Sequence, residues 1–276
     1  MLSQSGQGMM EQWTEAHPHL AELVRLHRCL EEAFAGAGLC ACPSAGRGGS
    51  RTAPTTDLPL LLHHRPDAPF FAQAGELLRQ VLTAMPTEGL PEQFCQQCSQ
   101  LREQVQHEPA AAARLIESQL AGAEDAGDGL ARFLIWKLLA KLLAPWREGL
   151  EQRLPELAWE EPICPLCGAG PSMAQLVRTS TGRKRLLVCG CCATRWEYKR
   201  IGCPHCGNEE QSQLSIIEPE DEPFRIDCCQ QCKGYIKTYT GKDDNGLMLA
   251  DWSSLHLDAL AMQQGWQRQA ESLYSL

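Results

Sequence analysis

Two short stretches of this sequence, Cys164-Pro165-Leu166-Cys167-Gly168 and Cys203-Pro204-His205-Cys206-Gly207, are closely similar and begin 39 residues apart. Each is followed by a further Cys-x-x-Cys pair, Cys189/Cys192 after the first stretch and Cys229/Cys232 after the second. The gap between the two pairs is 21 residues in the first half and 22 residues in the second. Residues 164–232 therefore contain an internal repeat, and each copy holds two cysteine pairs.

Short runs of apolar, aromatic and β-branched residues lie between and after the cysteine pairs, and this pattern is typical of β-strands. Thr179–Arg183, between two such runs, has the composition of a hairpin turn. An aromatic run follows the second pair of each copy, at Trp196–Tyr198 and at Tyr235–Tyr239. We therefore predict two successive zinc-ribbon or rubredoxin-like modules, with strands at 174–178, 185–189, 194–201, 214–217, 224–227 and 235–239.

The paired cysteines have the spacing of metal ligands. A Cys-x-x-Cys turn lets two thiolates reach one ion, and two such turns joined by a hairpin give a tetrahedral four-sulfur site. Soft thiolates select zinc, iron or a related metal rather than magnesium or calcium. Buried free cysteines, or ligand sets shared between the modules, are the alternatives. The sequence predicts two sites with one metal ion each: Cys164, Cys167, Cys189 and Cys192 form site 1, and Cys203, Cys206, Cys229 and Cys232 form site 2.

A site with four protein ligands has no position left for a water molecule. Such closed sites are structural, or carry one electron if the metal is iron, so metal-assisted hydrolysis does not fit. The sequence also lacks a phosphate-binding glycine loop that ends in Lys-Ser/Thr, and a serine nucleophile elbow. We therefore expect a protein that is not an enzyme.

Other thiols lie close to these patterns. Cys191 is inside the second cysteine turn, and Cys228 directly precedes the fourth. Each could be a redox-active thiol, an alternate ligand in a shifted register, or a bystander. Cys95 and Cys98 form a fifth pair, but they lie in a helical pattern without a partner pair, and their role stays open.

Residues 1–158 have the apolar spacing of helices rather than of strands. We expect helices at about 19–35, 69–85, 91–106, 109–120 and 130–154, the last one kinked near Pro145. Gly, Ser, Pro and Thr residues at 40–60 indicate a long loop, and a helix is again expected at about 252–264. The predicted fold class is α+β, with a helical domain (1–158), two rubredoxin-like modules (159–202 and 203–241) and a C-terminal helical segment (242–276).

The composition fits a globular protein of the cytoplasm. The 276 residues are 43% hydrophobic and 21% charged, which excludes a disordered chain. Met1–Met10 does not resemble a secretory signal, and the apolar stretch Leu130–Trp146 contains three basic residues and a proline, so we expect no membrane span. Cytoplasmic thiols stay reduced, which favours metal binding over disulfides at the cysteine pairs.

The charge differs between the two modules. Residues 164–202 contain seven basic side chains and one acidic, whereas residues 203–241 contain three basic and seven acidic. The basic hairpin of the first module could contact an acidic protein surface or a nucleic acid, or it could simply be a solvated face. The net charge of −9 argues against broad nucleic-acid binding.

With these features the chain resembles the formate dehydrogenase accessory protein FdhE family. The resemblance rests on the order of the four cysteine pairs, on Trp196-Glu197 and Gly234–Lys237 after them, and on Ala250–Leu255 with Leu257–Ala259. Ile135-Trp136 is a weaker match, and the similar region covers about residues 130–265. The eight paired cysteines correspond to the family pattern, whereas Cys191, Cys228, the Cys95/Cys98 pair and the 40–60 loop do not.

The resemblance implies a helical N-terminal domain followed by two rubredoxin-type modules. It implies a cytoplasmic protein that assists maturation of respiratory formate dehydrogenase by binding the catalytic subunit, which carries the molybdenum or tungsten cofactor. It also implies iron at the cysteine sites, although zinc fits the same ligands. A rubredoxin-like electron carrier or redox sensor and a nucleic-acid-binding zinc ribbon are the alternatives. The sequence leaves the oligomeric state open, a homodimer included.

Overall fold

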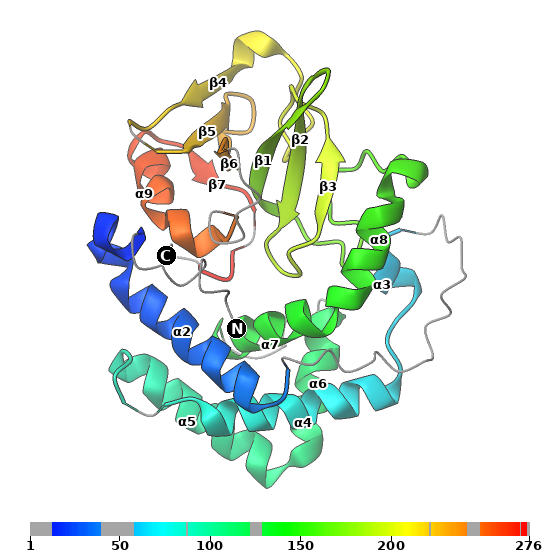
Figure 1. Ribbon diagram of the computed structural model, residues 1–276, viewed down its shortest axis with the longest axis vertical. Coiled ribbons are helices and arrows are strands. Elements are labelled where there is room, and N and C mark those ends of the chain that lie inside the picture. The colour runs from blue at the N-terminus through cyan, green and yellow to red at the C-terminus, as the bar shows by residue number, and fades with distance from the viewer. Residues whose placement is uncertain are drawn as a thin grey trace. The chain divides into compact units, whose positions relative to one another are not determined.

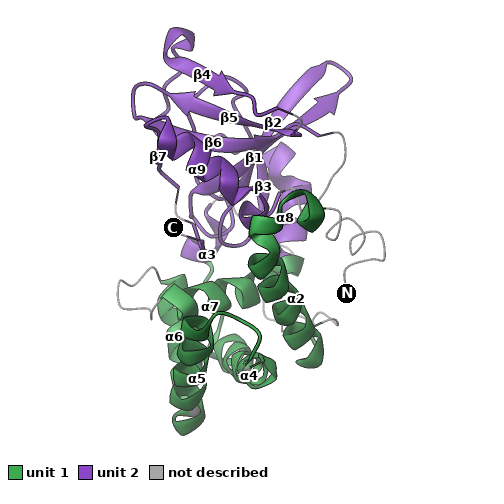
Figure 2. Cartoon of the chain, turned by 90° about the vertical axis from the view of Figure 1, so that its left-hand side faces the viewer, with its two compact units in different colours: residues 1–54, 64–145 green, residues 55–63, 146–276 purple. Residues whose placement is uncertain are grey.

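A computed structural model of the chain describes residues 13–39, 58–86, 88–121, 129–220, 222–241, 249–270 and 272–274. It has two compact units, one formed by Met1–Pro54 with His64–Pro145 and the other by Thr55–His63 with Trp146–Leu276 (Figure 2). Most of the loop predicted at 40–60 lies outside the described residues. The four-part division by sequence stays a prediction.

The first unit is helical, as its apolar spacing predicts. Its helix α7 has nine buried residues spread over several faces, and it packs against three other helices of the unit. A helix that is apolar on most faces belongs to a buried core. Among the described residues, no helix combines the length and the apolar character that crossing a membrane needs. The helices are η1 (Pro18–Leu20), α2 (Ala21–Gly36), α4 (Ala68–Ala84), α5 (Glu92–His107), α6 (Pro109–Leu120) and α7 (Gly129–Leu142) (Figure 1).

Helix α4 shows how this core is built. The carboxylate of Asp67 caps its first turn by accepting a hydrogen bond from Phe70 N–H at 3.0 Å. Its buried side chains recur every three or four residues. At Gly75 the helix lies so close to α6 that an added Cβ would be 2.9 Å from the backbone nitrogen of Ala113. Glycine is therefore needed at this position for packing rather than for turn formation.

The single helix predicted at 130–154 is in fact two helices, α7 and α8 (Ala144–Leu157), separated at Leu143. Pro145 explains the break. It has no N–H to donate to the carbonyl of Lys141, and its ring would clash with that carbonyl in a continuous helix. Pro145 lies instead in the first turn of α8, where an amide donor is not required.

The second unit contains one seven-stranded sheet in place of two separate ones. Antiparallel pairs join three strands of each cysteine module, as the sequence predicts. A parallel pairing of Met173–Gln175 with Lys237–Tyr239 then joins the modules, which gives the order β3-β2-β1-β6-β5-β4, with β7 beside β6. The strands are β1 (Pro171–Thr179), β2 (Gly182–Cys189), β3 (Arg195–Tyr198), β4 (Leu214–Ile217), β5 (Phe224–Cys229), β6 (Gly234–Tyr239) and β7 (Gln267–Arg268).

Short helical elements complete this unit. The helix predicted at 252–264 is a 3-10 turn, η3 (Asp251–Ser254), followed by α9 (Leu255–Gln263), and α9 packs against β6 (Figure 1). A second 3-10 turn, η2 (Gln211–Gln213), precedes β4, and the four-residue helix α3 (Leu60–His63) belongs to this unit although it lies far upstream in sequence. The α+β class with a helical N-terminal region is confirmed.

Gly75→Ala should destabilise the helical unit, although alanine is the better helix former by about 1 kcal/mol. The new methyl group would overlap the backbone of α6, and overpacking of this kind costs about 1–3 kcal/mol. Urea denaturation followed by circular dichroism measures the change. Gly149→Ala in α8 is the matched control, because nothing lies within 4 Å of its added Cβ, and it should stabilise by about 0.5–1 kcal/mol. A neutral or stabilising Gly75→Ala would contradict the close approach of α4 to α6.

Candidate metal centres

The first and third cysteine turns have the same backbone hydrogen bond. Gly168 N–H donates to the carbonyl of Cys164 at 2.9 Å, and Gly207 N–H donates to the carbonyl of Cys203 at 2.9 Å. Both glycines have left-handed backbone, with φ of 81° and 74°. Glycine adopts this conformation without a steric penalty, which is the role that the sequence pattern assigns to it.

The second and fourth turns reach the left-handed conformation without glycine. Ala193 follows Cys192 with φ of 60°, and Lys233 follows Cys232 with φ of 56°. For a residue with a Cβ this costs about 1–2 kcal/mol. Backbone amide groups of these turns point at sulfur atoms. For example, the backbone nitrogen of Cys192 lies 3.5 Å from Cys189 Sγ. The sequence gives no sign of this strain, because neither residue type is typical of a left-handed turn.

The structure brings the four predicted ligands of site 1 together. Cys164 Sγ lies 3.5 Å from Cys192 Sγ, and Cys167 Sγ lies 3.5 Å from Cys189 Sγ. All four sulfur atoms are within 4.8 Å of one another. Three of the residues are buried and Cys167 is partly exposed, so the site is shielded from solvent.

The four predicted ligands of site 2 also converge, but closer to the surface. Cys203 Sγ lies 3.6 Å from Cys232 Sγ, and Cys206 Sγ lies 3.7 Å from Cys229 Sγ. These sulfur atoms are likewise within 4.8 Å of one another. Cys206 is exposed, and Asn208 donates an amide hydrogen bond to Cys229 Sγ at 3.5 Å. The second site is therefore the more accessible of the two.

Both groups have the dimensions of a tetrahedral metal–thiolate site. A metal–sulfur bond of about 2.3 Å places the sulfur atoms of a tetrahedron about 3.8 Å apart, close to the observed separations of 3.5–3.7 Å. Burial raises the pKa of the thiols of Cys164 and Cys189. Thiolate formation there requires a compensating positive charge, and metal binding releases protons. Each group could hold one metal ion, and the donor set fits iron and zinc equally well.

A short upstream segment supports the first site. The N–H groups of Leu60 and Leu61 in α3 donate to the carbonyls of Pro165 and Leu166, at 2.8 and 2.9 Å. Arg147 in α8 donates to the carbonyl of Cys192 at 3.3 Å. Two cysteine turns of site 1 are thus fixed by elements outside the ribbon, and the sequence pattern did not indicate either contact.

Among the described residues, the other thiols considered above lie outside the two sulfur groups. Cys191 and Cys228 are both buried, and burial raises the pKa of Cys228 to about 12. A thiol with such a pKa is a poor nucleophile at neutral pH. Cys95 and Cys98 lie on α5 in the helical unit, where Cys95 Sγ is 3.7 Å from the carbonyl oxygen of Leu90. The role of Cys95 and Cys98, a redox role included, stays open.

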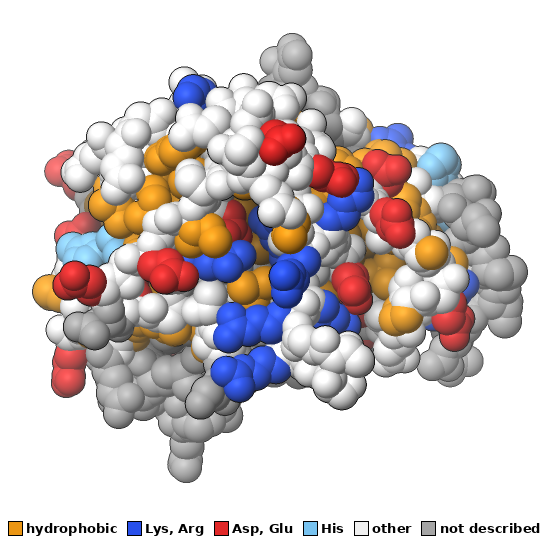
Figure 3. Space-filling model, turned by 90° about the horizontal axis from the view of Figure 1, so that it is seen from above, with side chains coloured by type: hydrophobic (Ala, Val, Ile, Leu, Met, Phe, Trp, Pro, Cys, Tyr) orange, Lys and Arg blue, Asp and Glu red, His pale blue; other side chains and the backbone are white. Residues whose placement is uncertain are grey.

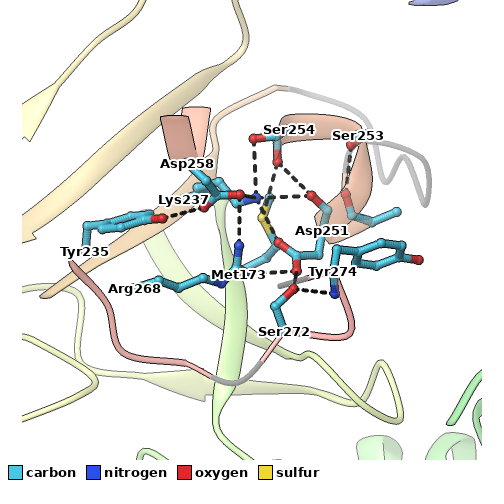
Figure 4. A network of polar contacts seen from close by, with 11 residues as sticks. Met173, Tyr235, Lys237, Asp251, Ser253, Ser254, Asp258, Arg268, Ser272 and Tyr274 are labelled. Carbon is cyan, nitrogen blue, oxygen red and sulfur yellow. Dashed lines mark hydrogen bonds and ion pairs between the residues drawn. The ribbon is translucent and has the colours of Figure 1, made fainter. Parts of the chain in front are cut away.

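A buried network of charged side chains lies on the face of the sheet that η3 and α9 cover (Figure 4). Lys237 Nζ is 2.8 Å from Asp251 Oδ1 and 2.7 Å from Asp258 Oδ2. Arg268 contacts the same two carboxylates at 2.6 and 2.8 Å, and Tyr235 donates to Asp258 Oδ1 at 2.7 Å. Two cations therefore face two anions, and the group ties β6 and β7 to η3 and α9. The sequence resemblance covers several of these residues but gives no sign that they interact.

The network sets the ionisation of Asp251. Burial alone would raise the pKa of this carboxyl group, but Lys237 and Arg268 outweigh burial and lower the pKa to about 2. The hydroxyl of Ser272 also donates to Asp251 Oδ2 at 2.7 Å. Removing one member of such a buried group leaves an uncompensated charge, which typically costs about 3–5 kcal/mol.

Comparisons with known proteins point to one family. The family model for the FdhE C-terminal domain matches residues 201–274, which include site 2 and the buried network. A protein named "Protein FdhE homolog" from Stutzerimonas stutzeri (strain A1501) is 35% identical over 153 residues, covering 53% of this chain and 50% of the relative. Another with this name from Aquifex aeolicus (strain VF5) is 30% identical over 173 residues, with 60% of each chain covered. The matches thus span half to 60% of the length of these relatives.

The fold is also similar to that of a solved structure. The crystal structure of the FdhE protein from Pseudomonas aeruginosa matches with a TM-score of 0.67 and 23% identity, covering 96% of this chain and 92% of the other. This similarity concerns the fold. Together with the sequence matches it confirms the resemblance to the FdhE family that the cysteine pattern indicated.

Site 2 should lose its metal to a chelator before site 1, because Cys206 is exposed whereas site 1 is shielded. With zinc as the probe, a chromogenic chelator should remove the metal in two phases. Cys164→Ser/Cys167→Ser retains site 2 and should show only the fast phase, and Cys203→Ser/Cys206→Ser retains site 1 and should show only the slow one. Equal or reversed rates would contradict the difference in accessibility.

The Asp251 network predicts a loss of stability in acid. Because the folded pKa of about 2 lies below the ordinary value of about 3.9, the stabilisation is present above about pH 4 and disappears as the pH falls toward 2. The free energy of unfolding should differ between wild type and Asp251→Asn by at least about 2–3 kcal/mol at pH 6, and the difference should shrink below pH 4. Wild type and variant have the same cysteine sites, so the acid sensitivity of those sites cancels in the difference between the two free energies of unfolding.

Urea denaturation at several pH values measures this difference. Glu218→Gln is the control, because Glu218 is an exposed carboxylate of the same unit, and it should change stability little at any pH. A difference for Asp251→Asn that stays constant from pH 6 to pH 3 would show that Asp251 does not have a lowered pKa.

Proposed function

We propose that this chain is an accessory protein for the maturation of respiratory formate dehydrogenase, and that it binds the catalytic subunit of that enzyme. The similarity to FdhE proteins supports this role. The proposal is a binding function rather than catalysis. We further propose that the protein acts in the cytoplasm, where its many thiols stay reduced and able to bind metal.

The observation that carries the proposal is the pair of four-cysteine groups on one continuous sheet. With four protein ligands, a metal ion in either group has no coordination position for a water molecule, so its role is to hold the ribbon together or to report on redox conditions. The turns around the sulfur atoms are short and include two strained residues. We therefore expect the conformation of these turns to depend on metal binding.

We infer iron as the physiological metal, because the family resemblance implies it. Zinc would give the same tetrahedral arrangement. The eight cysteines of sites 1 and 2 are the proposed ligands, and Asn208 donates a hydrogen bond to one sulfur atom of site 2. Hydrogen bonds to sulfur tune the reduction potential of an iron–sulfur site, so iron in site 2 would be open to redox control.

An electron carrier is the second candidate, and the exposure of Cys206 favours it, since electron exchange with a partner needs a site near the surface. The two candidates differ in their partner complexes. An accessory protein should form a complex that survives purification, whereas weak, small interfaces are typical of electron-transfer pairs.

The test is anaerobic affinity purification of the tagged chain from cells that express formate dehydrogenase. The catalytic subunit should co-purify with wild type, and Cys203→Ser/Cys206→Ser should reduce its recovery because site 2 cannot hold its metal. Cys95→Ser/Cys98→Ser is the matched control, since it also removes a Cys-x-x-Cys pair but lies in the helical unit.

Formate dehydrogenase activity of the same cells is the second measurement. It should fall with the site 2 variant and stay unchanged with the control. Absence of the subunit from the wild-type eluate would contradict the proposal. A reversible change of visible absorption on reduction, without any stable complex, would favour the electron carrier.

A further inference from the structure

A pocket of about 350 Å³ opens on the sheet face opposite the buried charge network. Cross-strand register puts Leu176 beside Arg185, and Ile216 beside Asp227, on that face. The wall next to site 2 is formed by Cys203, Pro204 and His205. The volume of the pocket is at the small end of the range for ligand pockets. Neither the cysteine sites nor the network explains why this face is left open.

The pocket is lined by more positive than negative charge. Four arginines contribute to its wall, and Asp227 is the acidic residue opposite them. If site 2 held a divalent ion with four thiolates, it would add a formal charge of −2, and the lining would still be positive by one. The surrounding protein has a net charge of −9, so this is a local reversal of sign. The arginines are Arg183, Arg185, Arg200 and Arg225.

Arg185 is the unusual member of this group, because it is only 2% exposed. Its Nη1 donates to the carbonyl of Gly202 at 2.8 Å, whereas Nη2 lies 3.7 Å from Asp227, too far for a hydrogen bond. Its buried Nε and Nη2 have no hydrogen-bond partner among the described residues. Asp227 is itself engaged by Arg225 at 2.9 Å and by Thr238 at 2.6 Å. Burial lowers the pKa of Arg185, and the nearby carboxylate of Asp227 offsets this only in part.

Apolar side chains lie beside these cations. Ile201 and Ile216 line the same pocket and are 43% and 52% exposed, which is high for large apolar residues. Leu176 and Ile236 form the buried part of the lining. A ligand that satisfies the whole pocket would carry a negative group next to an apolar one.

The pocket continues into a larger, open groove of about 1040 Å³. Three residues line both spaces, Arg183, Arg185 and Arg200. The buried Gln175 also lines the groove, and its Oε1 has no hydrogen-bond partner among the described residues. Around this hollow, Lys and Arg side chains lie among apolar and acidic ones (Figure 3). The acidic residues of the groove are Glu151, Glu160 and Glu197, fewer than its basic residues. The groove's other basic residues are Arg178, Lys184, Arg195 and Lys199.

We propose that this pocket and groove bind an extended acidic segment of a partner protein, with a carboxylate at Arg185 and a neighbouring apolar side chain between Ile201 and Ile216. The volumes of the pocket and groove, about 350 and 1040 Å³, favour a peptide over a small free anion. Charge-assisted hydrogen bonds from arginine to carboxylate would supply the affinity. The assignment rests on the proposed function only for the identity of the partner.

The probe is a fluorescein-labelled peptide of sequence Glu-Leu-Glu-Ile-Glu-Leu-Glu, measured by fluorescence anisotropy with the metal-loaded full chain. It should bind at low salt and weaken as salt increases, whereas the peptide with Gln in place of Glu should not bind. Arg183→Ala/Arg200→Ala should weaken binding by at least about tenfold, the equivalent of one lost charged contact. Both arginines are exposed, so the fold should survive.

The matched control is Arg28→Ala/Arg65→Ala. It removes the same charge from two exposed residues that line neither the pocket nor the groove, and it should change binding by no more than about twofold. Equal losses in the two double variants would overturn the proposal, since they would indicate a general charge effect. No binding of the acidic peptide up to 1 mM, or tighter binding of a labelled dT12 oligonucleotide, would overturn it as well.

Co-purification separates this proposal from the proposed function. If the acidic peptide binds the pocket but the formate dehydrogenase subunit does not co-purify, the pocket stands and the partner assignment fails. If the subunit co-purifies equally well with Arg183→Ala/Arg200→Ala while the peptide does not bind, the accessory role stands and the pocket proposal fails.

Discussion

The parallel pairing of β1 with β6 is the interaction on which the cysteine-rich unit depends. Each module alone would be a small antiparallel ribbon with little core. The three-residue contact between Met173–Gln175 and Lys237–Tyr239 makes one sheet of them and gives that sheet two distinct faces. One face is closed by η3 and α9 over the Lys237 network, and the other carries the arginine pocket beside site 2. The pocket requires the two modules to be joined in this register, because residues of both modules line it.

The two copies of the repeat have become different in their surroundings. Site 1 is covered by α3 and α8, whose contacts to Pro165 and Cys192 are made by the backbone and by Arg147. Site 2 has an exposed cysteine and borders the pocket. The two groups of four cysteines therefore lie in different environments, one shielded and the other accessible.

Local patterns in the sequence predict the elements well. The strand at 214–217 and the helix at 109–120 have the predicted bounds, and the eight cysteines lie in the two predicted groups. That these cysteines bind metal stays a prediction. The spacing of a cysteine turn or of an apolar stripe is set by residues close in sequence, and for this reason it can be read without a structure.

Long-range partners could not be predicted in this way. Lys237 lies between Ile236 and Thr238 in a strand, and nothing nearby in the sequence shows that Asp251 and Asp258 will enclose it. The β1–β6 pairing and the burial of Arg185 likewise depend on residues far apart in the chain. The break at Leu143 was anticipated only as a kink, because a proline indicates where a helix is disturbed but not how far the two parts separate.

The contact of α3 with the first cysteine turn also bears on the order in which the protein is made. Leu60 and Leu61 leave the ribosome about 100 residues before Pro165 and Leu166, the residues whose carbonyls they bind. At usual rates of synthesis this interval is on the order of ten seconds. During that time the rest of the helical unit, residues 64–145, is synthesised, while the segment at 58–63 still lacks its partner. The unit that contains the ribbon is thus built from two separate parts of the chain, and the first cysteine turn gains its backbone contacts from a segment made early in translation.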